Sequence, residues 1–153
     1  MRKMLLLFVL SVFAFSAFSQ AKIQSANKKT ENKTYYDRNG SKQGSARESN
    51  GTKTYYDKNG NRTGSAKIDN NGNKTYYDRN GSRKSTTRIN NGTESHYDKN
   101  GRRTGTTKVD ANGNKTHFDK DGRRTGTTKV DSNGNQTHYD SNGRKTGTTK
   151  VSK

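Results

Sequence analysis

The chain contains 153 residues, with 31 Lys and Arg against 13 Asp and Glu, which gives a formal net charge of +18. Hydrophobic residues make up 22% of it, far below the roughly 45–50% usual in globular domains, so one large apolar core is excluded. Because the chain has no cysteine, a disulfide framework and a lipid anchor on cysteine are excluded as well.

The first 19 residues differ in composition from the rest. Two basic residues precede an apolar run over 4–15, and the small residues Ala17 and Ser19 follow it. This order is typical of a secretory signal peptide, and the run is shorter than the about 20 residues that span a bilayer. We expect a signal peptide at 1–19 and no transmembrane segment after its cleavage. The mature protein, with 29 basic residues against 13 acids, is then secreted, periplasmic or at the cell surface.

Six copies of one unit follow a polar leader at 20–32. An aromatic pair recurs in every copy, from Tyr35-Tyr36 to His138-Tyr139, at steps of 20 or 21 residues. Such a short period is typical of proteins built from tandem supersecondary units. The units run over 33–52, 53–73, 74–93, 94–114, 115–135 and a shorter 136–153.

Each unit carries two turn signals, such as Asn100-Gly101 and Asn112-Gly113. Asn-Gly predicts a tight type I′ hairpin turn, in which both central residues have positive φ. Between the turns lie a short strand, as at 115–119, and a longer one, as at 123–131, without proline or helical periodicity. We predict an all-β fold of tandem hairpins of about 21 residues, forming a thin meander or a β-solenoid. Disorder is the alternative that the high charge and low hydropathy leave open.

Strand alternation places the two aromatics of each pair on opposite faces. The second place is aromatic in all six copies, so we expect this second aromatic column to form the packing face. An aliphatic column is expected to join it, and Glu48, its counterpart in the first unit, to face solvent at a terminal cap. The second aromatic column is Tyr36, Tyr56, Tyr77, Tyr97, Phe118 and Tyr139. The aliphatic column is Ile68, Ile89, Val109, Val130 and Val151.

Two columns are basic in every copy. Rows of one sign repel, so they favour a polyanionic ligand that would relieve the repulsion; a solubilising surface is the alternative. The columns are five residues apart and would lie on opposite faces, unless a β-bulge at the glycine between them brings both to one face; a plain loop is equally open. The first basic column is Lys42, Arg62, Arg83, Arg103, Arg124 and Lys145. The second is Arg47, Lys67, Arg88, Lys108, Lys129 and Lys150.

The first place of the aromatic pair tolerates histidine. Aromatic rings beside cations can stack on sugars or nucleobases, which makes this first aromatic column a candidate ligand platform; core packing is the alternative. The first aromatic column is Tyr35, Tyr55, Tyr76, His96, His117 and His138.

Metal binding, cofactor binding and catalysis find no support in the pattern. The three histidines stand one per repeat rather than converging, as metal ligands must. The aspartates before the turns, such as Asp98, are expected to accept backbone N–H groups as Asx turns. Nearly every acid or base occupies a repeated position, whereas an active site is unique and asymmetric. Ser95 and His96 fall on opposite faces, so no triad can form there. We expect no enzyme, no cofactor and no metal site.

The motif Tyr-Asp-x-Asn-Gly, at 36–40, 56–60, 77–81 and 139–143, and Tyr-Asp-Lys-Asn-Gly-Arg at 97–102, resembles the tyrosine-aspartate (YD) repeat. That repeat belongs to bacterial rearrangement-hotspot and wall-associated proteins, and the resemblance covers 33–153. It implies β-hairpins wound into large shells or carbohydrate-binding surfaces. The chain departs from the family pattern after Gly-Arg, where Arg103 or Thr63 stands in place of an apolar residue.

These observations predict an exported basic repeat protein that binds anionic polymers through its Lys and Arg columns. The partner would be lipopolysaccharide, an anionic wall polymer, an acidic polysaccharide or a nucleic acid. The alternative is a structural or matrix protein that self-associates through its β-edges, because Thr, Asn and Gly ladders without proline suit cross-β stacking.

Overall fold

Each repeat folds into a β-hairpin made of two antiparallel strands. The computed structural model describes residues 30–152, so the predicted signal peptide and most of the leader lie outside it. β-Branched and aromatic residues supply the strands, and turn residues separate them. The strands are β1 (Glu31–Asp37), β2 (Lys42–Ser49), β3 (Thr52–Asp57), β4 (Arg62–Ile68), β5 (Lys74–Asp78), β6 (Arg83–Asn90), β7 (Thr93–Asp98), β8 (Arg103–Val109), β9 (Lys115–Asp119), β10 (Arg124–Val130), β11 (Gln136–Asp140) and β12 (Lys145–Ser152).

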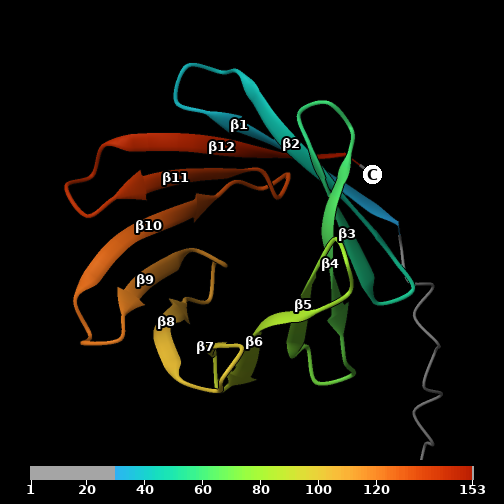
Figure 1. Cartoon of the computed structure of the whole chain (residues 1–153). Coiled ribbons are helices and arrows are strands. Elements are labelled where there is room, and N and C mark those ends of the chain that lie inside the picture. Colours follow the sequence, from blue (N-terminus) through green and yellow to red (C-terminus); the bar gives the residue numbers. More distant parts are fainter. Residues whose placement is uncertain (1–29, 153) are drawn as a thin grey trace, which may run out of the picture.

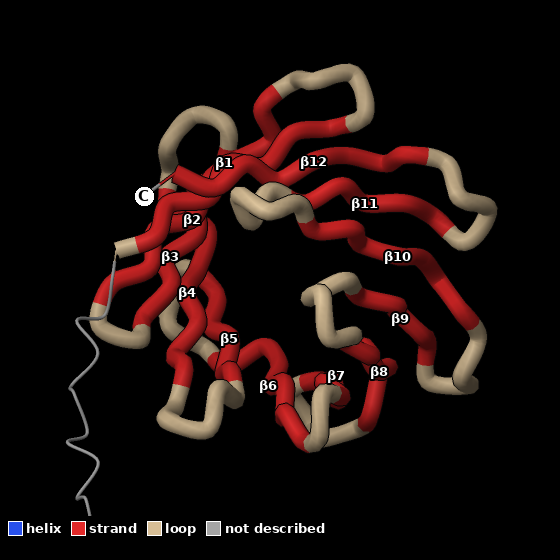
Figure 2. The backbone as a smooth tube through the Cα atoms, turned by 180° about the vertical axis from the view of Figure 1, so that it is seen from behind, coloured by secondary structure: helices blue, strands red, loops and turns tan. Residues whose placement is uncertain are grey.

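The strands pair in sequence order, and the last strand, β12, pairs with the first, β1, so the sheet closes into a barrel (Figure 1). The closing pair repeats the pairing between neighbouring repeats: Tyr35 lies opposite Thr149 as Tyr55 lies opposite Ala46. The all-β fold of tandem hairpins is confirmed. The predicted thin meander or solenoid is wrong, because the sheet curves until its two edges meet (Figure 2).

The pairing register fixes the shape of the barrel. Tyr35 lies opposite Gly44, and Gly44 lies opposite Asp57, which stands two places after Tyr55, the repeat equivalent of Tyr35. The register therefore advances by two residues per repeat, and the shear equals the number of strands. Eight-stranded barrels with that ratio tilt their strands by about 36° and just fill their interior with side chains. Twelve strands at the same ratio enclose a wider interior.

The hairpin turns are of two kinds, which explains the alternating 20- and 21-residue steps. Asn50-Gly51 and Asn91-Gly92 both have positive φ, as predicted for type I′ turns, and they end the 20-residue units. The remaining turns have a left-handed glycine only, so type I′ is wrong for them. There an aspartate side chain accepts two backbone N–H groups: Asp110 Oδ1 lies 2.9 Å from the nitrogen of Asn112 and 2.8 Å from that of Asn114. The predicted Asx turns are confirmed at these sites.

The inner face of the barrel carries the first aromatic column, not the second. Residues directly opposite on paired strands point to the same side, and buried Thr107 lies opposite His117. Val109, two places after Thr107, also faces inward, so the aliphatic column joins the first aromatic column. The expected packing face is therefore wrong, because alternation separates two faces without saying which one curves inward. The residues at most 3% exposed on this face are Ala46, Ala66, Thr87, Thr107, Thr128 and Thr149.

Glu48 also departs from expectation. It faces the barrel interior, where its carboxylate lies 3.8 Å from the ammonium nitrogen of Lys53. A closed barrel has no terminal repeat to cap, since the first repeat is covered by the last. The described part of the chain contains no helix long and apolar enough to cross a membrane.

Candidate functional site

A β-bulge brings the two basic columns to the same face of the sheet. In the fourth repeat Tyr97 lies opposite Arg103 and His96 lies opposite Gly105, so one residue of β8 is skipped. Because the bulge takes one residue out of the strand alternation, Arg103 and Lys108 point to the same side of the sheet. Of the bulge and the plain loop that the glycine left open, the bulge is the one present, and it recurs in every hairpin. All twelve side chains of the two basic columns are exposed on the outer wall.

Glycine follows the bulge because the backbones approach closely there. A Cβ built on Gly105 would lie 2.4 Å from the carbonyl oxygen of Phe118 on the next strand, and Gly126 would meet Tyr139 at 2.3 Å. This close contact explains why glycine occupies both positions, since neither Gly105 nor Gly126 has a left-handed φ. Ser85 is the only non-glycine residue at this repeat position.

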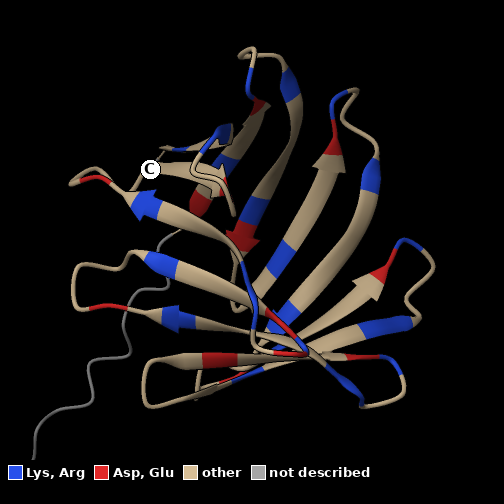
Figure 3. Cartoon of the chain, turned by 90° about the vertical axis from the view of Figure 1, so that its left-hand side faces the viewer, with Lys and Arg blue, Asp and Glu red and all other residues tan. Residues whose placement is uncertain are grey.

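Cationic and aromatic strands alternate around the outer wall. Tyr97 on β7 has Arg103 directly opposite on β8, and the Arg88 guanidinium on β6 lies 5.4 Å from its ring centre. Comparable contacts at 5.6 to 5.9 Å place a lysine ammonium over the ring in four other repeats, and each is a cation–π interaction. The pairs are Lys67 with Tyr77, Lys108 with Phe118, Lys129 with Tyr139 and Lys150 with Tyr36. Figure 3 shows basic residues along the strands and not only in the turns.

Three arginines of the first basic column also hold neighbouring hairpins together. Each donates to a backbone carbonyl in the turn of the next repeat: Arg62 to Arg79 at 3.1 Å, Arg83 to Lys99 at 3.0 Å, and Arg124 to Ser141 at 2.9 Å. These arginines therefore have a structural role. The second basic column forms no such backbone bond among residues 30–152, and five of its six members lie over an aromatic ring, Arg47 being the exception.

The acidic side chains of residues 30–152 bond inner lysines or groups in the turns rather than the two basic columns. The three glutamates lie inside the barrel and pair with Lys33, Lys53 and Lys115. Asp121 pairs with Lys120, and the other aspartates accept backbone N–H groups in their own turns. All 13 acids of the chain are thereby accounted for. Within the described residues, no member of either basic column forms a salt bridge.

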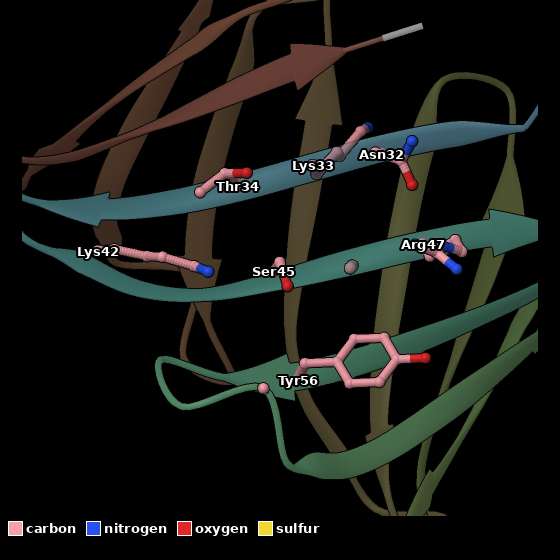
Figure 4. A pocket seen from close by; sticks show the side chains of 9 residues that line it. Asn32, Lys33, Thr34, Lys42, Ser45, Arg47 and Tyr56 are labelled. Atoms are coloured by element: carbon pink, nitrogen blue, oxygen red, sulfur yellow. The ribbon is translucent and has the colours of Figure 1, made fainter.

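Shallow grooves follow the wall between hairpins. One groove has a volume of about 450 Å³ and is lined by Lys42, Ser45, Arg47 and Tyr56, whose side chains Figure 4 shows together. A second groove of about 290 Å³ contains the equivalent residues of the third repeat, Arg83, Thr86 and Arg88, together with Asp69 and Asp98. The groove thus recurs two repeats apart, here with two carboxylates beside its cations.

The first aromatic column, predicted as a ligand platform beside the cations, lies on the opposite face from them. Its three histidines form a hydrogen-bonded chain with the inner threonines, at nitrogen–oxygen distances of 2.9 to 3.0 Å. Burial lowers the pKa of all three imidazoles. The chain runs Thr87–His96–Thr107–His117–Thr128–His138–Thr149.

The residue types at the inner positions change together from the first repeats to the last. Tyr55 and Tyr76 lie directly opposite Ala46 and Ala66, whereas Tyr35, at the closing pair, lies opposite Thr149. Where histidine replaces tyrosine, threonine replaces alanine, because each imidazole nitrogen needs a hydroxyl partner away from water. Tyr76 stands at the boundary, between Ala66 and Thr87. The histidines are therefore structural, and in the described part of the chain no group of His, Asp and Glu is placed to hold a metal ion.

The second aromatic column is the part of the outer site that sequence reasoning missed. Its assignment to the core followed from its being aromatic in every copy. The signal that could have corrected it is the bulge: once both basic columns share a face, the residue opposite the first basic column, such as Tyr97 opposite Arg103, must share it too.

A scan against family models and a search of curated proteins find no match to this chain. The resemblance to YD repeats therefore stays a prediction.

Proposed function

We propose that this protein binds anionic polymers of the cell envelope or extracellular medium through the outer wall of its barrel. The observation that carries the proposal is the basic wall: two exposed basic columns alternate with aromatic rings, and within residues 30–152 no member of either column forms a salt bridge. Clustered charges of one sign raise the free energy of the folded protein. A bound polyanion would lower it.

The geometry suits a linear polymer with both charges and flat faces. Equivalent residues of neighbouring repeats are two strands apart, about 10 Å at the usual strand spacing. Each repeat offers an aromatic face between two cations, as Tyr97 lies between Arg88 and Arg103. Acidic polysaccharide, lipopolysaccharide, wall polymer and nucleic acid all combine phosphate, carboxylate or sulfate groups with rings that can stack. Several linked contacts would add avidity.

The alternative of a matrix protein joined through β-edges loses support. Barrel closure pairs β1 with β12, so the described strands leave no open edge to template another chain. The first aromatic column also loses support as a ligand platform next to the cations, because it faces the interior.

Equilibrium binding to purified lipopolysaccharide, an anionic wall polymer, duplex DNA and a neutral glucan, across a salt series, tests the proposal. Affinity for the anionic polymers should fall steeply with salt, with a logarithmic slope of about −0.9 per phosphate contact on duplex DNA. The triple variant Lys108→Gln, Lys129→Gln, Lys150→Gln should bind all of them more weakly and with a shallower slope. The side chains of these lysines donate no hydrogen bond to a backbone carbonyl in the described structure, so the variant should keep its fold.

The matched control is Arg38→Gln, Lys58→Gln, Lys99→Gln. It removes the same charge from the turns instead of the wall. Equal losses in the two triple variants would reduce the effect to net charge and overturn the proposal. Salt-independent binding, or binding of the neutral glucan alone, would also overturn it.

A further inference from the structure

A cavity inside the barrel contains lysine and tyrosine side chains that the outer wall does not use. It has a volume of about 330 Å³ and lies against the inner face from β1 to β6. Its polar lining consists of Lys33, Lys53, Lys74, Tyr55, Tyr76 and one carboxylate, Glu48. Its size is at the small end of the roughly 300–1,000 Å³ typical of sites for small molecules.

The charges around this cavity do not balance. Lys33 pairs with Glu31 at 3.0 Å, and Lys53 has only a long contact of 3.8 Å with Glu48. Lys74 forms no salt bridge within residues 30–152, because Glu94, the next acid on the inner face, bonds Lys115 at 3.0 Å. Burial and the neighbouring ammonium groups of Lys33 and Lys74 lower the pKa of Lys53, against the opposing effect of the glutamates. The inner face thus carries four lysines against three glutamates.

The remaining lining is phenolic and aliphatic. Burial raises the pKa of Tyr55 and Tyr76, against the opposing effect of a hydrogen bond between Tyr76 and Thr87, so both remain neutral hydroxyls that can donate a hydrogen bond. Ala66, Ile68 and Ile89 form the apolar part of the lining. A site with ammonium and phenol donors on one part and aliphatic groups on another fits a small molecule with both an anionic group and an apolar body.

We propose that this cavity binds a small organic anion. Lys53 and Lys74 would hold a carboxylate or phosphate ester group with hydrogen bonds from Tyr55 and Tyr76, and the aliphatic lining would cover the apolar body. This site lies on the opposite face of the sheet from the polymer-binding wall, so it does not depend on the proposed function.

Calorimetric titration of the full chain with benzoate, phenyl phosphate and benzyl alcohol tests the site. The two anions should bind, and the neutral alcohol should not. Lys74→Gln should weaken both anions at least tenfold, and the fold should tolerate it because Gln136 occupies the same repeat position. Tyr76→Phe, which removes only a hydroxyl, should weaken them as well and provides a second variant. Lys67→Gln, which removes an outward charge from β4, is the matched control and should leave the binding of both small anions unchanged.

The result separates the two sites. Tyr76→Phe should leave polymer binding intact, whereas the outer triple variant should leave benzoate binding intact. Absence of anion binding, equal binding of benzyl alcohol, or equal loss in Lys74→Gln and Lys67→Gln would each overturn the inner site without affecting the outer one.

Discussion

The imidazole Nε2 of His117 lies 2.9 Å from the hydroxyl oxygen of Thr128, on the neighbouring strand inside the barrel. Its Nδ1 lies 3.0 Å from Thr107, so the ring links two hydroxyls across three strands. A neutral imidazole has one donor and one acceptor nitrogen, and each hydroxyl donates once. The whole chain is therefore satisfied when all three imidazoles are neutral and all its bonds run in one direction.

Acidification should destabilise the barrel. Burial lowers the pKa of His96, His117 and His138 below the ordinary 6.5. The ammonium groups of Lys74 and Lys115 lower the pKa further within this chain, and the carboxylate of Glu94 opposes them. The unfolded chain then binds more protons than the folded one below about pH 6.5, so this stability is present above that pH and lost as the pH falls. Urea unfolding at about pH 7.5 and 5.0 measures the loss.

A triple variant isolates the histidine contribution. Replacing His96, His117 and His138 by tyrosine, the residue of the first three repeats, removes the titrating groups from the inner chain. Its stability should change little over the same pH range. A wild-type protein equally stable at both pH values would contradict the prediction.

Barrel closure can be tested with one disulfide. Thr34 on β1 lies opposite Lys150 on β12, and both point outward. Opposite Cα atoms in an antiparallel pair are about 4.5–5.5 Å apart, within disulfide range. Thr34→Cys with Lys150→Cys should oxidise readily and stabilise the fold by about 2–4 kcal/mol. Thr34→Cys with Lys108→Cys, several strands apart, should stay reduced. A non-reducing peptide map that shows no link in the first variant would exclude the closed barrel.

The inner aromatics should matter more for stability than the outer ones. Tyr76 faces the interior and its pKa is raised by burial, whereas Tyr77 lies on the wall with Lys67 at 5.9 Å. Full burial of a large apolar side chain stabilises by roughly 1.5–3 kcal/mol, and an exposed cation–π contact by about 0.5–1 kcal/mol. Tyr76→Ala should therefore lower the denaturation midpoint more than Tyr77→Ala. The reverse order would place the faces the other way round.

The glycine after the bulge should resist substitution. A Cβ at Gly126 would lie 2.3 Å from the carbonyl oxygen of Tyr139, so the strands must separate to admit it. We expect Gly126→Ala to cost about 1–3 kcal/mol, as overpacking does. Ser85 occupies the equivalent position in the third repeat, so the barrel can close although one repeat carries a side chain there. Thr125→Ala, an exposed change in the same strand, is the control, and equal midpoints for the two variants would contradict the close approach.

Much of the outer site was accessible from sequence because it depends on local chemistry. Turn residues such as Asp110 and Gly113 define the hairpins, and each hairpin bond forms between residues close in the chain. The glycine between Arg103 and Lys108 indicated a bulge or a loop, and the bulge sets both cations on one face whatever the rest of the sheet does. What sequence reasoning missed was that Tyr97 shares that face, because its recurrence was read as a sign of burial.

The amino-acid sequence by itself determined the repeats, the strands and the positions of the turns, since contacts within one hairpin decide all of these. It left open whether the glycine forms a bulge or a loop, and so whether the two basic columns share a face. Only the tertiary structure decided which face turns inward and that β1 meets β12. Strand alternation is symmetric with respect to the two faces, and closure depends on curvature accumulated over all six hairpins. That accumulation also places Lys53 and Lys74 inside the barrel, where no pattern of hydrophobicity would put a charge.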